Sequence, residues 1–207
     1  ARFRRSVGLF NSGKPRVTWA PRLHNLIGFP QGIPGPRLLE RFAKHIRNYR
    51  QIYQVEAQVA VRRNGPGFSI LAPSGAEYLA RKVVLATGVQ DRQPSLPNLE
   101  RLRRTGLLRY CSICDGYEMG KKTAAVLVCD EAGIQKALYL SRWSKDMTII
   151  APPGLRLTPT RERQIAGVGA KLIRCEHFSL QNTHRGKRMT FRLDDGARVR
   201  TGIVYVE

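Results

Sequence analysis

The hydrophobic and polar positions along the chain predict an alternation of strands and helices. Ser6 to Phe10 is a short apolar run followed by a turn, which is typical of a buried strand. Arg37 to Tyr49 carries apolar residues at the spacing of one helix face. The residues between these two segments are rich in proline and glycine, so they predict a long irregular loop. Long loops of this kind commonly cover an active site or bind a ligand.

The middle of the chain predicts a run of strands. Ile52 to Val61 and Gly67 to Ala72 are expected to form a meander around a turn at residues 64–67. Ala80 to Leu85 is expected to form another buried strand, which runs into an Ala-Thr-Gly segment. The polar, proline-containing stretch at residues 90–97 then predicts a junction between two domains.

The second half of the chain repeats the alternation. Strands are predicted at Thr123 to Val128, Met147 to Ala151 and Lys171 to Arg174, and helices at Ala132 to Trp143 and Thr160 to Val168. The chain is expected to close with a hairpin formed by Thr190 to Leu193 and Arg198 to Val206. The order strand, helix, strand calls for parallel crossovers, so the predicted fold class is α/β.

Composition narrows the class of protein. Of the 207 residues, 42% are hydrophobic and 25% are charged, a balance that suits a folded chain rather than a disordered one. No stretch approaches the ~20 apolar residues that cross a bilayer, and the first residues do not form a secretory signal. No membrane contact and a cytoplasmic location are therefore expected. The four cysteines are too few for a disulfide scaffold and suit a reducing compartment.

The excess of positive charge raises nucleic acid as a partner. The chain has 36 Lys and Arg against 15 Asp and Glu, a formal net charge of +21. The basic residues are spread along the chain, and no zinc-finger, helix-turn-helix or aromatic RNA-binding pattern accompanies them. A solvated basic surface is therefore the favoured interpretation, and a nucleic-acid or other polyanion partner stays open as the alternative.

The segment Cys111-Ser-Ile-Cys114 is the most informative motif. Two thiols at this spacing can close a small disulfide, and a thiol at a helix N-terminus ionises more easily, so redox chemistry is favoured. Two alternatives stay open: an inert structural pair, and half of a zinc site completed by Cys175 and His177, whose spacing does not match a common ligand pair. No metal site is predicted. Cys129 and Cys175 are expected to be small buried side chains.

Asp115 follows the second cysteine directly. A carboxylic acid next to a dithiol can deliver or accept the proton that thiol–disulfide exchange requires. The alternative is that Asp115 simply caps a helix.

Four segments of the chain match, in order, the segments of one enzyme family. Tyr110-Cys-Ser-Ile-Cys-Asp-Gly-Tyr-Glu118 is similar to its redox motif, and Val83 to Gly88 is similar to a strand that ends in Ala-Thr-Gly and touches flavin. Ala137 to Ser141 resembles the helix after a nucleotide-binding turn, and His24 to Gly35 resembles the segment before the first long helix. Over nearly its whole length the chain thus resembles the thioredoxin reductase-like, FAD/NAD(P)-dependent pyridine nucleotide-disulfide oxidoreductases.

The resemblance implies two Rossmann-like, three-layer domains. Residues 1–92 would be a partial FAD-binding-like domain, and residues 93–207 an NAD(P)-binding-like domain that carries the CxxC motif. Electrons would pass from NAD(P)H through FAD to the disulfide, and then to a disulfide in thioredoxin or another partner. Cys111 would be the interchange thiol, Cys114 would face the flavin, and Asp115 would be the acid. A homodimer is a further expectation.

The resemblance also implies where FAD would bind. Ala86, Thr87 and Gly88 would lie near the flavin. Asn11 stands where the family has an acidic residue that holds a ribose hydroxyl, and its amide can still accept a hydrogen bond.

Two departures from the family pattern change these expectations. No glycine-rich strand and turn precede Ser6, and no closing flavin segment follows the last strand, so the FAD-binding domain is expected to be incomplete. In the nucleotide-binding turn of the second domain, the glycine positions fall at Val128, Asp130 and Gly133. Because Asp130 and Glu131 repel phosphate, NADPH is not expected to bind well there. A catalytically degenerate remnant that serves as an interaction module is therefore an alternative to the enzyme.

Overall fold

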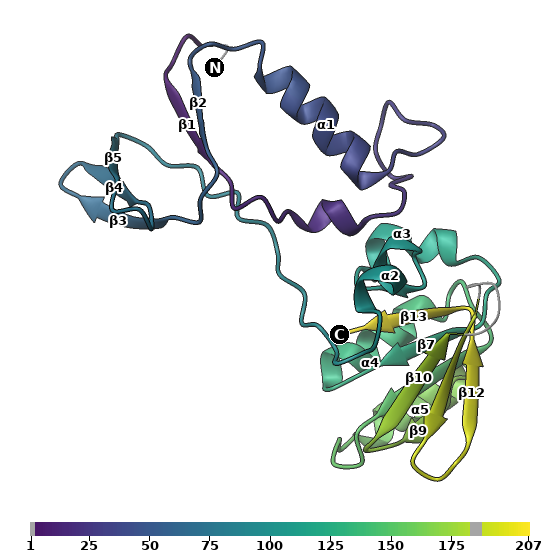
Figure 1. The fold of residues 1–207 in the computed structure, drawn as a ribbon. Coiled ribbons are helices and arrows are strands. Elements are labelled where there is room, and N and C mark those ends of the chain that lie inside the picture. The colour runs from purple at the N-terminus through teal and green to yellow at the C-terminus, as the bar shows by residue number, and fades with distance from the viewer. Residues whose placement is uncertain (1–2, 183–187) are drawn as a thin grey trace. The chain divides into compact units, whose positions relative to one another are not determined.

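The structure, a computed structural model, describes residues 3–182 and 188–207 (Figure 1). Its elements fall into two compact units, unit 1 (Ala1–Thr18 and Gly35–Gln90) and unit 2 (Trp19–Pro34 and Asp91–Glu207). Both units combine helices with strands, so the α/β class predicted from the alternating pattern is confirmed.

Unit 1 contains a parallel strand pair, one long helix and a three-stranded meander. Its elements are β1 (Val7–Phe10), η1 (Arg16–Trp19, whose last residue belongs to unit 2), α1 (Gly35–Ile46), β2 (Ile52–Val55), β3 (Ala60–Asn64), β4 (Gly67–Leu71) and β5 (Glu77–Ala80). β1 lies parallel to β2, while β3, β4 and β5 pair antiparallel. The predicted turn at residues 64–67 is confirmed, because Asn64 pairs with Gly67 across it.

The buried strand predicted for Ala80 to Leu85 is wrong. β5 ends at Ala80, residues 82–96 belong to no helix or strand, and Val84 and Leu85 are 90% and 73% exposed. An apolar run becomes a buried strand only where neighbouring strands pair with its backbone and other layers cover its side chains. In the described part of unit 1, β1 and β2 form a sheet of only two strands. Within that part of the unit, residues 82–85 therefore have no neighbouring strand to pair with and no layer that covers their side chains.

The centre of unit 2 is a five-stranded parallel sheet with the strand order β6-β13-β7-β8-β9. Its strands are β6 (Leu108–Arg109), β7 (Ala124–Leu127), β8 (Met147–Ala151), β9 (Lys171–Arg174) and β13 (Ile203–Val206), and its helices are α2 (Leu99–Arg104), α3 (Ser112–Met119), α4 (Glu131–Leu140) and α5 (Pro159–Gly167). α4 connects β7 to β8, and α5 connects β8 to β9, so the predicted crossovers are confirmed. α5 begins after Thr158, whose hydroxyl accepts the Arg161 N–H at 3.3 Å.

A second sheet of unit 2 is antiparallel and consists of β10 (Phe178–Asn182), β11 (Met189–Leu193) and β12 (Arg198–Thr201). The closing hairpin predicted from the sequence is confirmed for β11 and β12. The continuous strand predicted from Arg198 to Val206 is wrong, because the chain leaves the antiparallel sheet at Gly202 and enters the parallel sheet as β13. The Thr201 hydroxyl and the Gly202 N–H both donate to the Thr123 carbonyl at 3.0 Å and hold this bend.

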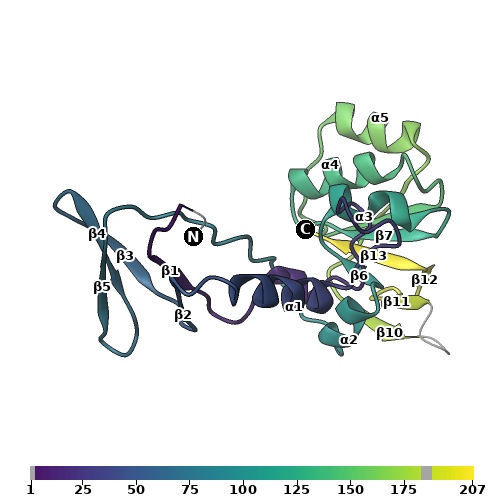
Figure 2. The ribbon, with the colours of Figure 1, turned by 90° about the horizontal axis from the view of Figure 1, so that it is seen from above.

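The inner strands of the parallel sheet, β13, β7 and β8, are buried on both faces. On one face, Val126 and Ile149 share an apolar cluster with Ile134 of α4. On the other face, Ile150 shares a second cluster with Phe191 of the antiparallel sheet. Figure 2 shows the resulting layers of unit 2, with α4 and α5 on one side of the parallel sheet and β10, β11 and β12 on the other. Strands covered on both faces are apolar along their whole length, which explains why the sequence predicted β7 and β8 closely.

Among residues 3–182 and 188–207, no helix combines the length and the apolar composition that crossing a membrane requires.

Candidate functional site

Cys111 and Cys114 lie at the start of α3, directly after β6, and are joined by a disulfide. Their Cα atoms are 5.3 Å apart. Cys111 is the N-cap residue of α3, and its Sγ accepts the Cys114 N–H at 3.1 Å. Free N–H groups at the start of a helix stabilise a thiolate, so the geometry favours ionisation of Cys111 when the pair is reduced. Cys114 is exposed to solvent and Cys111 is half-buried.

Asp115 interrupts α3 rather than capping it. Its backbone has φ −145° and ψ 15°, which is not helical. Its carbonyl accepts hydrogen bonds from Arg109 Nη1 at 2.8 Å and from the Tyr205 hydroxyl at 3.2 Å. Its side chain is also engaged, because Oδ1 accepts from the Tyr205 hydroxyl at 2.9 Å and Oδ2 lies 3.5 Å from Arg109 Nε. The structure therefore surrounds the predicted acid with a cation from β6 and a phenol from β13.

Arg109 and Tyr205 are site residues that the sequence did not single out. Tyr205 is fully buried, and its ring belongs to the apolar cluster between the parallel sheet and the helices. Burial raises the pKa of the Tyr205 phenol, and the neighbouring Asp115 carboxylate raises it further, so Tyr205 stays a neutral hydrogen-bond donor. The sequence showed Tyr205 only as a tyrosine within the apolar run of β13. Its hydrogen-bond partner, Asp115, lies 90 residues away along the chain.

Gly116 allows the start of α3 to pack closely against the end of α4 and the residues after it. A Cβ atom at Gly116 would lie 3.1 Å from the Trp143 ring and 3.5 Å from a Leu140 methyl group. On the solvent side of the same helix, Ile113 and Tyr117 are 79% and 81% exposed. The disulfide turn is thus anchored to the sheet and α4 on one side, and open to solvent on the other.

The residues predicted to lie near FAD are in unit 1. Asn11 follows β1, and its Oδ1 accepts the Gly13 N–H at 3.1 Å, which closes a local turn. Ala86, Thr87 and Gly88 are exposed and lie outside any strand. A flavin site is concave and buries most of the ring system, whereas this segment is exposed and no described strand pairs with it, so the residues present do not fit FAD.

The N-terminus of α4, where the resemblance places the pyrophosphate of NADPH, is occupied by the chain's own carboxylate. Asp130 Oδ1 accepts the N–H groups of Ala132 and Gly133 at 2.9 and 3.2 Å. Gly133 has no room for a side chain, because a Cβ atom there would lie 2.7 Å from Val128 Cβ. Since the amides that would receive a phosphate already bind a carboxylate, the turn does not fit a dinucleotide.

Lys136, which lines a pocket beside this turn, is paired as well. Lys136 Nζ lies 2.8 Å from Glu207 Oε2 and donates to the Val206 carbonyl at 2.9 Å. Glu131 forms an ion pair with Arg161 of α5. The pocket of about 290 Å³ that Asp130 and Lys136 help to line carries the acidic residues Asp91, Asp130 and Glu207 beside the basic residues Arg92 and Lys136, which disfavours a phosphate there.

The cap formed by Asp130 predicts a stability effect. The Asp130→Ala variant should lower the free energy of unfolding of unit 2 by about 1 kcal/mol, because two helix N–H groups lose their acceptor. Urea unfolding followed by tryptophan fluorescence measures the change, since Trp19 and Trp143 both belong to unit 2. Asp130→Asn keeps an acceptor and should cost much less. Equal losses in the two variants would contradict the role of the cap.

The two cysteines outside the motif differ in their environment. Cys129 is exposed, so its expected burial is wrong: it lies one residue beyond Val128, where β7 has ended and the turn faces solvent. Cys175 is buried as expected, and its Sγ donates to the His177 carbonyl at 2.8 Å. Among the described residues, no group of three or more His, Cys, Asp or Glu side chains is placed to hold a metal ion.

This difference predicts selective labelling. With the Cys111–Cys114 disulfide closed, iodoacetamide near neutral pH should modify Cys129 and spare Cys175. Burial raises the pKa of the Cys175 thiol, so less of the reactive thiolate is present at that pH. Peptide mass spectrometry reads the two sites separately, and Cys129→Ser should remove the labelling. Faster modification of Cys175 than of Cys129 would contradict the prediction.

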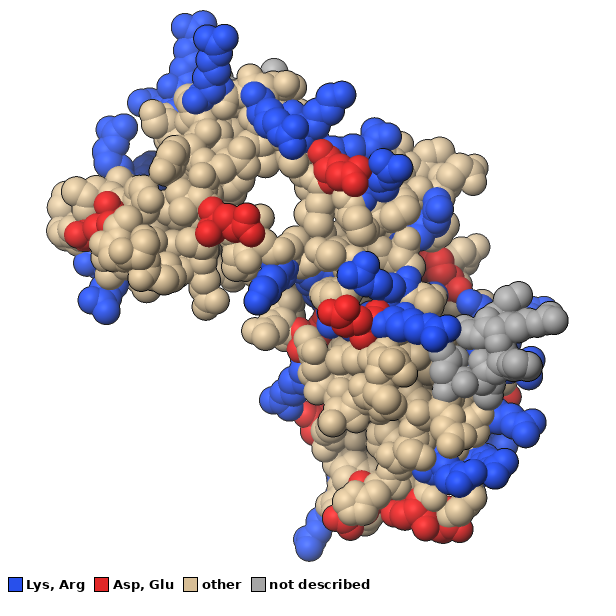
Figure 3. All heavy atoms as spheres, in the orientation of Figure 1, with Lys and Arg blue, Asp and Glu red and all other residues tan. Residues whose placement is uncertain are grey.

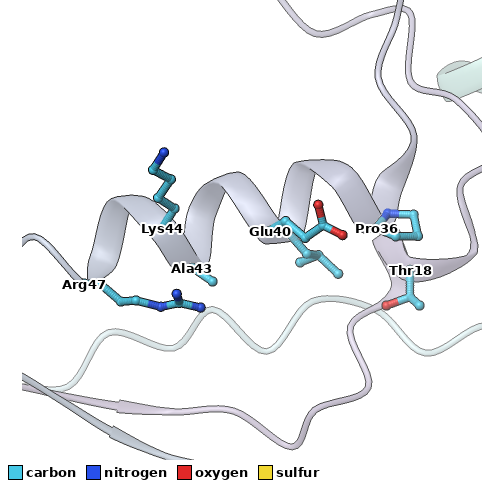
Figure 4. Close-up of a pocket in the computed structure, with 7 residues that line it drawn as sticks. Thr18, Pro36, Glu40, Ala43, Lys44 and Arg47 are labelled. Atoms are coloured by element: carbon cyan, nitrogen blue, oxygen red, sulfur yellow. The ribbon is translucent and has the colours of Figure 1, made fainter.

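A pocket of about 630 Å³ lies along α1 in unit 1. Figure 4 shows Thr18 and Pro36 at one end of this pocket, and Lys44 extending away from the segment that carries Thr18. None of the residues predicted to bind a cofactor lines it.

Positive charge is spread over both units on the face drawn in Figure 3. This distribution suits the solvated basic surface expected from the sequence. The sequence does not favour nucleic acid as a partner, and this stays a prediction. DNA binding that weakens steeply with rising salt would contradict it.

Comparison with known proteins gives the following similarities. No family model matches the sequence. The thioredoxin reductase of Streptomyces coelicolor is 29% identical over 128 residues, which are 62% of this chain and 39% of that protein. The bifunctional thioredoxin reductase/thioredoxin of Mycobacterium leprae is 28% identical over 128 residues, 62% of this chain and 28% of that protein.

A solved structure shares the fold. The crystal structure of a putative thioredoxin reductase TrxB from Bacillus anthracis matches with a TM-score of 0.83 and 23% identity, and the match covers 99% of this chain and 68% of that one. The chain spans less than half the length of the two curated relatives named above.

Proposed function

Because the chain is a thioredoxin reductase-like member of the pyridine nucleotide-disulfide oxidoreductase family, matched over part of its relatives' length, we propose that Cys111 and Cys114 form a redox-active pair. The pair would exchange electrons with a disulfide of thioredoxin or a similar partner. The observation that carries the proposal is the disulfide at the N-terminus of α3, with Cys114 exposed and Cys111 at the N-cap. An inert structural pair would not need an exposed sulfur or an ionisable thiol at a helix N-terminus.

Exchange starts from the reduced chain. The Cys111 thiolate attacks one sulfur of the partner disulfide, a mixed disulfide forms, and the other partner sulfur leaves as a thiolate. The Cys114 thiolate then attacks Cys111 Sγ, which closes the Cys111–Cys114 disulfide and releases the second partner sulfur. Two electrons pass from the chain to the partner, and two protons follow them, so the partner ends as a dithiol.

Asp115 is proposed as the residue that handles a proton in this exchange. It directly follows Cys114, and exchange in either direction requires a thiol to lose or a thiolate to gain a proton. Cys111, Cys114 and Asp115 would then act together on one turn of α3.

FAD and NAD(P)H are the electron carriers that the resemblance implies. Since the residues of this chain do not fit either group, the exchange written above uses only sulfur chemistry and takes a dithiol as reductant. A homodimer and a cytoplasmic location belong to the same proposal.

A redox titration tests the proposal. The chain is equilibrated in buffers with different ratios of reduced and oxidised dithiothreitol, free thiols are alkylated, and the peptide of residues 110–121 is weighed. We expect a two-electron transition at Cys111 and Cys114, and transfer of electrons from the reduced chain to a thioredoxin reporter. A pair that stays oxidised at every ratio, in a chain that melts cooperatively, would contradict the proposal.

That contradicting outcome would support the second candidate, an interaction module without redox activity. The observation that favours it is the carboxylate cap at α4, which occupies the place of a phosphate. The alkylation readout of the titration separates the two candidates, because a module needs no opening of the disulfide.

A further inference from the structure

We propose that Arg109 and Tyr205 are positioning residues that hold the Asp115 carboxylate beside the dithiol and thereby set how readily the Cys114 thiolate forms. The proposal rests on the proposed function, because it assigns two further residues to the same redox centre. The three residues Arg109, Asp115 and Tyr205 are called the Asp115 cluster below.

The Asp115 cluster joins three elements of unit 2. Arg109 ends β6, Tyr205 lies in β13, and β6 and β13 are neighbours in the parallel sheet, with Tyr205 opposite Arg109 in the register. The two side chains therefore leave adjacent strands and converge on one residue of α3. Both carboxylate oxygens and the carbonyl of Asp115 receive contacts from this pair.

The backbone of Asp115 is shaped by these contacts. At φ −145° and ψ 15°, the residue does not continue the helix, and Arg109 and Tyr205 supply donors to its carbonyl. Arg109 is itself fixed, because its Nε donates to the Gly106 carbonyl at 3.1 Å. Arg109 and Tyr205 thus fix the position of the Asp115 carboxylate and also compensate its negative charge.

Several titratable and charged groups surround the carboxylate. Arg109 faces it from β6 and Tyr205 from β13, while Cys111, Cys114 and Glu118 share α3 with it. α4 and the residues that follow it pack against Gly116 of α3 through Leu140 and Trp143. Tyr139 of α4 meets the Trp143 ring edge-on, and Arg142 lies over Tyr139.

Asp115 directly follows Cys114, and adjacent Cα atoms lie about 3.8 Å apart. Along the chain, the Asp115 carboxylate is the nearest negative charge to the Cys114 sulfur, and charges at such short range influence each other's ionisation. A bare carboxylate would disfavour a neighbouring thiolate. Arg109 offsets that charge with a cation and Tyr205 with a hydrogen bond from a buried phenol that stays protonated. Removing either partner should therefore make the thiolate harder to form.

The test measures the pH dependence of Cys114 alkylation in the full chain after reduction by a phosphine. Tyr205→Phe removes only the hydroxyl, and we expect the pH midpoint of alkylation to rise by about half a unit, which slows the reaction about threefold below the midpoint. Arg109→Gln should raise the midpoint further, and Arg109→Lys, which keeps the cation, should restore most of it. The matched control Tyr117→Phe removes an exposed hydroxyl from the same helix and should leave the midpoint unchanged.

A double-mutant cycle separates positioning from a general structural role. In the Asp115→Asn background, Tyr205→Phe should cause no further shift, because its effect passes through the carboxylate. The proposal is overturned if Tyr205→Phe behaves like Tyr117→Phe, or if its shift is the same with and without Asp115. If Tyr205→Phe fails to fold, the comparison of Arg109→Lys with Arg109→Gln decides, since equal midpoints would overturn the proposal.

The outcome is independent of the redox titration. Alkylation is measured on a chemically reduced chain without a partner, FAD or NADPH. A shifted midpoint in a chain that does not exchange with a partner would overturn the proposed function and leave the Asp115 cluster standing.

Discussion

Replacement of Cys114 by serine should lower the reduction of a thioredoxin reporter by about a hundredfold or more, because the sulfur that resolves the mixed disulfide is gone. Cys111 keeps its place at the N-cap of α3 and can still attack a disulfide once. The variant should therefore accumulate a covalent complex in which Cys111 is joined to the partner. Cys111→Ser should lose the same activity without forming that complex.

Non-reducing gel electrophoresis and intact mass measure the trapped complex. Reporter reduction by chain that was reduced beforehand and freed of the reductant measures the activity, because free dithiothreitol would itself cleave the mixed disulfide. Cys129→Ser is the matched control, since it removes an exposed thiol outside the motif. Its activity should equal that of the unmodified chain. A Cys114→Ser chain that still turns over, or complexes that form equally well through Cys129, would refute the assignment of the redox pair.

The Ile149→Ala variant should lower the free energy of unfolding of unit 2 by about 2–5 kcal/mol. Ile149 is fully buried in β8, where its side chain belongs to the cluster between the parallel sheet and the helices. Truncation removes three buried carbon atoms and leaves a cavity that close-packed neighbours fill only in part.

The control for this prediction is the same substitution at an exposed isoleucine of unit 2. Ile113 is 79% exposed, and Ile113→Ala should change the stability by no more than about 0.5 kcal/mol. Urea unfolding followed by the fluorescence of Trp19 and Trp143 reports on unit 2 in both variants. A small loss in Ile149→Ala, or equal losses in both, would mean that β8 is not at the centre of the core.

Sequence patterns predicted the elements whose signal is local. Met147 to Ala151 matches the observed β8, because an apolar strand buried on both faces is visible as a continuous run. Lys171 to Arg174 matches β9, an edge strand whose two apolar residues lie between exposed charged ends. α4 and α5 were predicted within a few residues, since their caps and apolar spacing are also local. The predictions for Ala80 to Leu85 and for Arg198 to Val206 were wrong, because pairing with distant strands decides whether an apolar run becomes one strand, two strands or none.

The residues of the candidate site also divide into those that the sequence predicted and those that only the fold revealed. The spacing of Cys111 and Cys114 predicted that the two sulfurs could bond, and Asp115 was visible as their neighbour. Arg109 carried no signal of its own, and Tyr205 looked like one more strand residue. Their roles depend on the register that puts Tyr205 opposite Arg109, and a register between β13 and β6 cannot be seen in either segment alone.

The amino-acid sequence by itself determined the α/β class, the redox motif and the altered turn before α4, since each of these is written in residues that are close along the chain. The tertiary structure alone decided that Asp115 would meet a cation and a buried phenol, and that Asp130 would occupy the amides of α4. Hydrogen bonds and ion pairs act over a few ångströms, so a residue 90 positions away along the chain becomes a partner only when the folded sheet brings it there.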